Sequence, residues 1–358
     1  MTKIPEENSL RRQFELSLIP PRGTADSIDV SFLHRSFCVA GLPIKRPKAQ
    51  HFSRNDSAFS LNINAPTLTL PGGQEVEVGV PFGPRARLEI VWMATEARDP
   101  RRDARNRWLE IGRIDEWLRS IGIRANHDAA LSAKEQLVKL AFSSFTMILR
   151  DQGFDLFKSD KLIESAAFGE TDLEHFAAGR LAKVRWPIAL ELSQKAYERF
   201  IGEDAIAIPT QRLVAISHSA MAIDVFLYLC YRLPEIPKGD SDLVTWKRLI
   251  AQFGKPGEAP SKFRETFQSS IVAALGAYPE ANLDLTEEGL VLRYSDPAEL
   301  RRAFISTFQP NGDTRRRRKL RNRIEDASIP PGAVHARGEA RCSLRRKEGP
   351  GGNLSLPR

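Results

Sequence analysis

The sequence has few cysteines and no long uncharged apolar segment. Its 358 residues include three cysteines, which lie far apart at Cys38, Cys230 and Cys342. An odd number of widely spaced cysteines argues against a disulfide framework and against a cysteine-based zinc site. No run of about eighteen uncharged apolar residues occurs, so no membrane-spanning helix is expected. The polar N-terminus lacks the apolar core of a secretory signal, which favours a cytoplasmic protein.

Motifs of the enzymes that act on DNA are also missing. The six histidines contain no His-x-His pair, which a metal-dependent strand-nicking enzyme would need. Gly254-Lys255 runs into proline and not into Ser or Thr, so no phosphate-binding loop is predicted. Asp240-Ser241-Asp242 has the spacing of a two-metal carboxylate pair, but its position after Pro237 favours a solvated turn. We therefore expect no catalytic residue, no metal site and no cofactor.

Positive charge is concentrated at one end of the chain. The formal net charge is +8, yet residues 315–358 hold thirteen Lys or Arg and four acidic residues. That tail alone carries +9, which leaves residues 1–314 at −1. A near-neutral body with a basic tail is typical of proteins that contact nucleic acid, because each phosphate contact releases counterions. A solvated tail without a specific partner is the alternative.

Length and local composition predict two folded units between two less regular ends. Residues 1–78 are rich in Pro, Ser and Asn and are expected to be partly ordered. Residues 79–178 and 179–314 carry the helical periodicity, and we assign one domain to each. Residues 315–358 are rich in Gly, Pro and Arg with few large apolar side chains, so this basic tail is expected to be disordered.

The two central blocks share one predicted order of elements. The first block gives a helix from Gly83-Pro84, an arginine-rich loop at 98–107, helices at 114–121 and 132–149, and extended segments at 154–157 and 183–192. The second gives a strand at 206–208, helices at 211–216 and 220–233, a strand at 243–245, helices at 246–253 and 261–278, and a hairpin at 281–294. Helices followed by a two-stranded ribbon indicate a winged helix-turn-helix. The predicted fold class is therefore α+β and helix-rich, with two tandem winged-helix domains.

Seven segments between residues 78 and 297 share an order and a spacing with one protein family. They are VGVPFGPRARLEIVWMATEA (78–97), LEIGRIDEWLRSIGI (109–123), EQLVKLAFSS (135–144), IALELSQKAYERF (188–200), AIDVFLYLCYRL (222–233), VTWKRLIAQFG (244–254) and YPEANLDLTEEGLVLRYSDP (278–297). Together they resemble the C-terminal replication domain of plasmid-encoded RepA replication initiators. Where that family has a Thr-Gly-Gly-type turn, this chain has Arg124 to Asp128.

The resemblance implies a function in plasmid replication. It implies binding to repeated double-stranded DNA sites at a plasmid origin, local opening of the duplex, and recruitment of host replication proteins such as DnaA and the replicative helicase. It leaves open whether a monomer or a homodimer is the active form, and it implies no membrane partner. A winged-helix transcriptional repressor without a replication role is the first alternative. A module that binds acidic proteins through its basic tail is the second.

Candidate DNA contacts follow from the predicted recognition helices, because the second helix of a helix-turn-helix lies in the major groove. With the apolar stripe of 132–149 turned inward, the side chains expected to face DNA are Ser132, Gln136, Lys139, Ser143 and Arg150. In the second block the same construction places Lys262, Arg264, Thr266 and Ser269 on the outer face or its flank. Gln suits adenine, whereas Lys and Arg suit guanine or phosphate. The alternative for each residue is an ordinary solvated helix face.

Further basic residues are candidates for phosphate contacts, which position a protein on DNA without reading its sequence. Lys247 and Arg248 lie on the helix before the second predicted recognition helix, and Arg85 and Arg87 start the first helix. The loop at 98–107 adds Arg101, Arg102, Arg105 and Arg107, although Asp99 and Asp103 reduce its charge. That loop fits a solubilising linker equally well.

Overall fold

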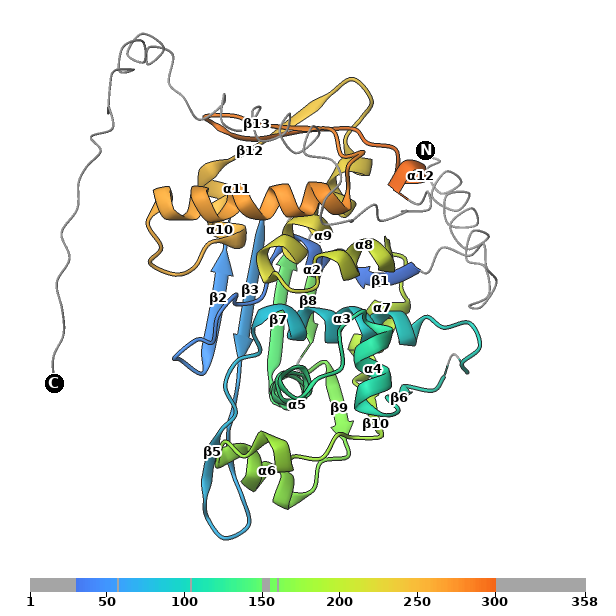
Figure 1. Ribbon diagram of the computed structural model, residues 1–358, viewed down its shortest axis with the longest axis vertical. Coiled ribbons are helices and arrows are strands. Elements are labelled where there is room, and N and C mark those ends of the chain that lie inside the picture. The colour runs from blue at the N-terminus through green and yellow to red at the C-terminus, as the bar shows by residue number, and fades with distance from the viewer. Residues whose placement is uncertain (1–29, 57, 104, 150–154, 160, 301–358) are drawn as a thin grey trace, which may run out of the picture.

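The computed structural model describes residues 30–56, 58–103, 105–149, 155–159 and 161–300. Arg150 and the tail 315–358, with their predicted roles, lie outside the described residues. The described chain is a mixed α/β arrangement of helices and several small sheets (Figure 1). Much of the region predicted to be partly ordered, from residue 30 to 78, forms strands.

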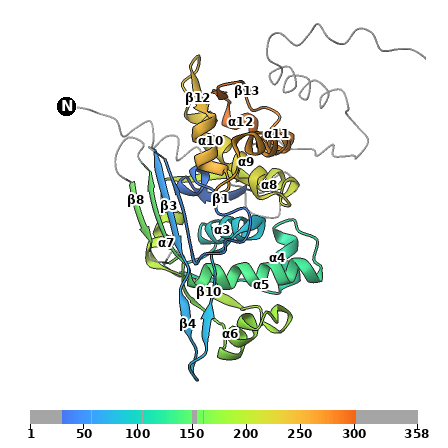
Figure 2. The same cartoon turned by 90° about the vertical axis from the view of Figure 1, so that its left-hand side faces the viewer.

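A four-stranded antiparallel sheet forms one side of the molecule. Its strand order is β2 (His51–Asn55), β3 (Phe59–Asn64), β7 (Ser144–Leu149) and β8 (Asp155–Ser159). Alternation along β3 sends Phe59, Leu61 and Ile63 into the core and the residues between them toward solvent. Helices α3 (Gly83–Ala97) and α5 (His127–Phe142) lie on the inner side of this sheet (Figure 2).

The first set of helices begins with α3. Pro84 occupies the first turn of α3, where a missing backbone N–H costs no helical hydrogen bond. The helix α4 (Ile114–Ser120) follows as predicted, and Gly122, with φ of 72°, leads the chain away from it. The strand β6 (Trp108–Glu110), which precedes α4, was not predicted. The Asn126 side chain then caps α5 by accepting a hydrogen bond from the backbone N–H of Ala129.

The helix predicted over 132–149 has different bounds in the structure. It starts at His127 because Asn126 provides the N-cap, and it ends at Phe142. Residues 144–149 form the strand β7, which pairs with β3 along its whole length and buries Phe145 and Met147. The prediction of helix beyond residue 142 was therefore wrong, since a strand partner some eighty residues away determines the conformation there.

The second set of helices agrees more closely with the prediction. Its elements are α9 (Ala220–Glu235), β12 (Ser241–Thr245), α10 (Trp246–Phe253), α11 (Pro260–Ala277), β13 (Leu283–Leu285) and β14 (Gly289–Arg293). Thr245 caps α10, since its hydroxyl accepts a hydrogen bond from the backbone N–H of Arg248. The hairpin expected at 281–294 is present as β13 and β14, paired in antiparallel register.

Both sets have the same connectivity. Apart from β7 and β8, which follow α5 and belong to the four-stranded sheet, each runs helix, strand, helix, helix, strand, strand. In each set the first strand pairs with the last, which also pairs with the middle one. The two sheets are β6–β10–β9 and β12–β14–β13, where β9 is Ile163–Ala166 and β10 is Ala189–Leu192. The predicted pairing of 154–157 with 183–192 was wrong, because β8 pairs with β7 and β10 pairs with β6 and β9. The predicted domain boundary at 178/179 thus passes through the first of these sheets.

Besides β7 and β8, the first set differs from the second by an excursion between β9 and β10. This excursion contains α6 (Glu170–Ala177) and the short 3-10 helix η1 (Leu181–Lys183), and it packs on α5 and on the arm of β4 (Thr67–Thr69) and β5 (Glu75–Glu77). Asp172 closes it by accepting hydrogen bonds from the backbone N–H of Gly169 and of Arg185. The remaining elements are β1 (Val30–His34), α2 (Ser36–Val39), α7 (Gln194–Ile201), β11 (Ala205–Pro209), α8 (Thr210–Ala215) and α12 (Pro297–Leu300).

One continuous hydrophobic core joins the two sets of helices. At their junction the Arg87 guanidinium of α3 forms a bidentate ion pair with the Asp224 carboxylate of α9, and both N···O distances are 2.6 Å. Arg54 of β2 donates to the carbonyl oxygens of Gly41 and Gly254, at 2.8 and 2.7 Å. Buried polar contacts and shared apolar packing therefore fuse the two halves.

Candidate nucleic-acid interface

Helix α11 presents a polar face to solvent, as predicted. Its inner side chains Phe263, Phe267, Ile271 and Ala274 are buried. On its outer side Lys262, Arg264 and Ser269 are exposed, and Thr266 is half-buried. The orientation therefore fits a recognition helix, whereas contact of these four residues with DNA stays a prediction.

Hydrogen bonds within α11 decide what its outer face offers a ligand. The hydroxyl groups of Thr266 and Ser269 donate to the backbone carbonyls of Lys262 and Thr266, at 3.0 and 2.8 Å. Their protons are thus engaged, and their oxygen lone pairs remain to accept from base or water donors. The Lys262 ammonium lies 2.8 Å from the Glu265 carboxylate. This hydrogen bond raises the pKa of Lys262 and lowers the pKa of Glu265, so the pair is charged but locally neutral.

Basic side chains flank α11. The Arg264 guanidinium lies over the Trp246 ring, 5.1 Å from its centroid, and the indole N–H of Trp246 donates to the Thr286 carbonyl. Lys247 is exposed on the first turn of α10. Arg248 is half-buried and lies 3.5 Å from the Asp56 carboxylate. Arg264 and Lys247 are accordingly placed to reach phosphates beside α11, while much of the Arg248 charge is balanced within the protein.

The candidate residues of the first set are mostly not on the surface. Gln136, Lys139 and Ser143 are 1%, 3% and 0% exposed, so their predicted outward orientation was wrong. The Gln136 side-chain oxygen accepts from the backbone N–H of Phe82, at 2.8 Å. The Lys139 ammonium lies 3.0 Å from the Glu135 carboxylate and 4.6 Å from the centroid of the Phe82 ring. Ser132 is half-buried.

The segment that leads into α3 accounts for the contacts of Gln136 and Lys139, and the excursion between β9 and β10 covers another side of α5. The Lys134 ammonium of α5 donates to the Ala182 carbonyl of η1, and the Trp186 ring packs 5.2 Å from the Trp117 ring of α4. One side of α4 and α5 is therefore covered by the protein's own chain. Arg87, predicted to contact phosphate, was also misplaced, because it is 4% exposed and all its donors serve Asp224 and backbone carbonyls.

A cluster of basic residues that the sequence did not single out lies at the start of α3. Lys45, Arg46 and Lys48 are exposed on the loop that follows Pro43, and Pro43 accepts a hydrogen bond from the backbone N–H of Gly83. Arg46 pairs with Glu135 and lies over the Phe82 ring, 5.5 Å from its centroid. The spacing of three basic residues within four positions was the sequence signal that could have indicated this cluster.

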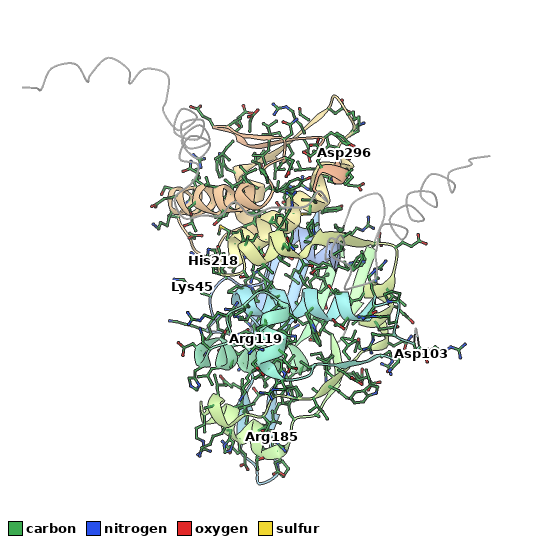
Figure 3. All side chains as sticks on the ribbon, turned by 45° about the vertical axis from the view of Figure 1, so that its right-hand side comes forward. Lys45, Asp103, Arg119, Arg185, His218 and Asp296 are labelled. Atoms are coloured by element: carbon green, nitrogen blue, oxygen red, sulfur yellow. The ribbon has the colours of Figure 1, made fainter. Side chains whose placement is uncertain are left out.

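Arg85 and His218 lie beside this loop. Arg85 is half-buried, burial lowers its pKa, and its guanidinium reaches the Ser217 carbonyl at 3.5 Å. Figure 3 shows Lys45 and His218 on one side of the molecule, together with α11, and Asp103 on the opposite side. Arg54 contacts both the loop before Lys45 and the loop before α11, which agrees with this grouping.

Within the described residues, no group of three or more His, Cys, Asp or Glu side chains is arranged to hold a metal ion. None of the helices in this part of the chain combines the length and apolar character needed to cross a bilayer.

Comparison with known proteins gives a limited result. No family model and no curated protein matches the chain, so the resemblance of residues 78–297 to RepA stays an expectation. Among solved structures, a crystal structure of domains 2 and 3 of RctB is similar over 69% of this chain and 83% of that chain, with 10% identity and a TM-score of 0.40. A selenomethionine derivative of the same RctB domains aligns over 66% and 82%, with 11% identity and a TM-score of 0.39.

Proposed function

We propose that this chain is a DNA-binding replication initiator and that each set of helices is a winged-helix unit. The observation that carries the DNA-binding part is the second set. There, α11 follows α10 as the second helix of a helix-turn-helix, packs on α9, precedes the hairpin of β13 and β14, and turns its polar face outward. That arrangement lets a helix enter the major groove while its apolar side stays in the core.

The two units have different tasks in this proposal. The helix α11 reads base edges with Lys262, Thr266 and Ser269, while Arg264 and Lys247 contact the flanking phosphates. The helix α5 does not read bases, because Gln136 and Lys139 are buried and bond to Phe82 and Glu135 within the protein. The first unit instead contributes backbone contacts through Lys45, Arg46, Lys48 and Arg85.

The turn of the second wing is not a phosphate contact in this proposal. It connects β13 to β14 and exposes Glu287 and Glu288. Two carboxylates would be repelled by the DNA backbone, since opposite charge is what releases counterions on binding. The affinity for phosphate is therefore assigned to the basic residues of α10, α11 and the loop at 45–48.

The replication role rests on the seven segments that resemble plasmid RepA initiators. It comprises binding to repeated origin sites, opening of the duplex, and recruitment of DnaA and the replicative helicase in the cytoplasm, without enzymatic activity. Permanganate footprinting on an origin fragment tests it. Reactive thymines in an A·T-rich segment next to the protein sites support an initiator. Saturated duplex binding without any reactive thymine would assign the chain to the winged-helix repressors.

The DNA-binding part is tested by substitution on α11. We expect Lys262→Ala to weaken binding to a specific duplex by about 1–3 kcal/mol. Glu265→Gln should strengthen it, because it releases Lys262 from its ion pair. Lys183→Ala is the matched control, since Lys183 is an exposed lysine on η1. Equal duplex affinity of the Lys262 and Lys183 variants, measured by anisotropy at fixed salt, would rule out α11 as the reading helix.

A further inference from the structure

Trp108 is exposed on an edge strand. It is 44% exposed, while its neighbour Leu109 is fully buried, because alternation along β6 turns one side chain outward and the next inward. The other tryptophans are buried or half-buried, namely Trp92, Trp117, Trp186 and Trp246. An indole is the largest apolar side chain, so its exposure next to a charged loop suggests a ligand with an aromatic face.

The loop that precedes Trp108 holds five arginines and two aspartates between residues 98 and 107. Three of these arginines anchor the loop. Arg98 donates to the carbonyls of Phe200 and Gly202, Arg102 donates to the carbonyl of Trp108, and Arg107 donates to the carbonyl of Leu192 and pairs with Glu191. The loop is thereby tied to β6, β10 and α7, which fixes its position relative to the indole.

The other two arginines, Arg101 and Arg105, are exposed. Arg101 has a side chain that is 62% exposed and pairs with Asp99. Arg105 is exposed, and within the described residues no hydrogen bond or ion pair of its guanidinium is found. Lys161 and Lys195 are exposed near the same end of the sheet, since the backbone of Arg107 bonds to Leu192 and that of Leu162 bonds to Ser193. Exposed cationic side chains therefore lie on the loop that leads into Trp108 and beside the adjoining ends of β9 and β10.

We infer that Trp108 and the arginines 101 and 105 form a binding site for a single-stranded nucleic acid. An unpaired base stacks on the indole, and the guanidinium groups contact the phosphates on either side of that base. Stacking needs only the π face of a base, so the site tolerates any sequence. A duplex does not fit in the same way, because the faces of its bases are covered by their neighbours.

A protein partner is the competing occupant, since Trp and Arg are also common in protein interfaces. Such interfaces place the aromatic residue within a wider apolar patch. Here another exposed apolar side chain is Ile188, whose carbonyl accepts from the backbone N–H of Ile111, beyond the far end of β6 from Trp108. The exposed residue Glu110 lies between Trp108 and Ile111 in the sequence. An exposed indole that directly follows an arginine-rich loop favours a nucleotide strand.

The site is separate from the surface proposed for duplex DNA. Asp103, in the same loop, lies on the side of the molecule opposite to Lys45 and His218 (Figure 3). The two surfaces can therefore be tested independently, and a failure of one leaves the other untouched.

The experiment uses the full chain and a labelled oligothymidine, because thymine homopolymers have little structure of their own. Anisotropy should show that Trp108→Ala weakens binding about tenfold or more, and that Trp108→Phe keeps most of the affinity. Arg105→Ala should reduce the slope of log affinity against log salt by about 0.7, the value for one phosphate of a single strand. Lys183→Ala should change neither quantity.

Tryptophan fluorescence gives a second measurement, which would not change on binding if Trp108 had only a structural role. Binding of oligothymidine should quench tryptophan emission in the wild type, and this quenching should be lost in Trp108→Phe even though that variant still binds. Duplex affinity should be the same in all Trp108 variants. Unchanged oligothymidine affinity in Trp108→Ala, or full quenching in Trp108→Phe, would overturn the inference and leave the exposed indole to a protein partner.

Discussion

Replacement of Arg87 by alanine tests whether the junction between the two helical sets is structural. The Arg87 and Asp224 side chains are 3% and 4% exposed, and Arg87 also donates to the carbonyl oxygens of Gly83 and Pro43. Alanine leaves the Asp224 carboxylate buried without its partner. Loss of one member of a buried ion pair costs about 3–5 kcal/mol, a large share of the roughly 5–15 kcal/mol that stabilises a folded protein.

Urea unfolding at neutral pH, followed by tryptophan fluorescence, measures this loss as a shift of the midpoint. Two further variants keep the test informative if Arg87→Ala does not fold. Arg87→Lys keeps the positive charge but loses the bidentate geometry, so it should be destabilised less than Arg87→Ala is. The double variant Arg87→Met with Asp224→Leu removes both charges and should recover much of the stability.

The same variants decide between a structural and a DNA-contacting Arg87. We expect the folded Arg87→Lys protein to bind duplex DNA as tightly as the wild type does. A loss of stability below about 1 kcal/mol, which is the range of an exposed ion pair, would refute the reasoning. So would a loss of duplex affinity at unchanged stability.

Three other predictions concern burial, packing and charge. Burial raises the pKa of Glu89, so the folded protein holds the proton of this carboxyl more tightly than the unfolded chain does. The wild type therefore loses stability as pH rises above about 4.5. Glu89→Gln should be more stable than the wild type at pH 8 in urea unfolding, and the difference should close toward pH 4.5. Gly122→Ala should cost about 1–3 kcal/mol more than Gly179→Ala, because both glycines have positive φ but only the first would place a Cβ against Val214; equal melting temperatures would contradict this. Deletion of 315–358 should flatten the salt dependence of binding to random duplex, since it removes thirteen basic residues; an unchanged slope would contradict it.

Local signals were enough to predict many of the helices. Pro84 at the start of α3 and the apolar stripe of α11 follow rules that act within a few residues, and both helices are present. The strand β7 was missed because Phe145 and Ile148 also have helical spacing. Its conformation is decided by β3, a partner far away in sequence, which periodicity within one segment cannot reveal.

The side chains proposed to contact DNA could be predicted correctly only on a helix whose outer side is exposed. The outer face of α11 could be derived from its apolar stripe, since Lys262 and Ser269 are exposed among the described residues. The same construction failed for α5, because a helical wheel does not show that Phe82 contacts Gln136 and Lys139. Trp108 was overlooked because a strand of three residues gives almost no alternation to detect.

The close packing at the junction has a mechanical consequence. Gly122 of the first set has no room for a Cβ beside Val214, and Arg54 bonds to backbone on both sides. The face around α11 and the loop around Trp108 are therefore held at a fixed separation. A DNA molecule that touched both would have to supply the bending and strand separation itself, because the protein could not swing its halves without exposing their common interior.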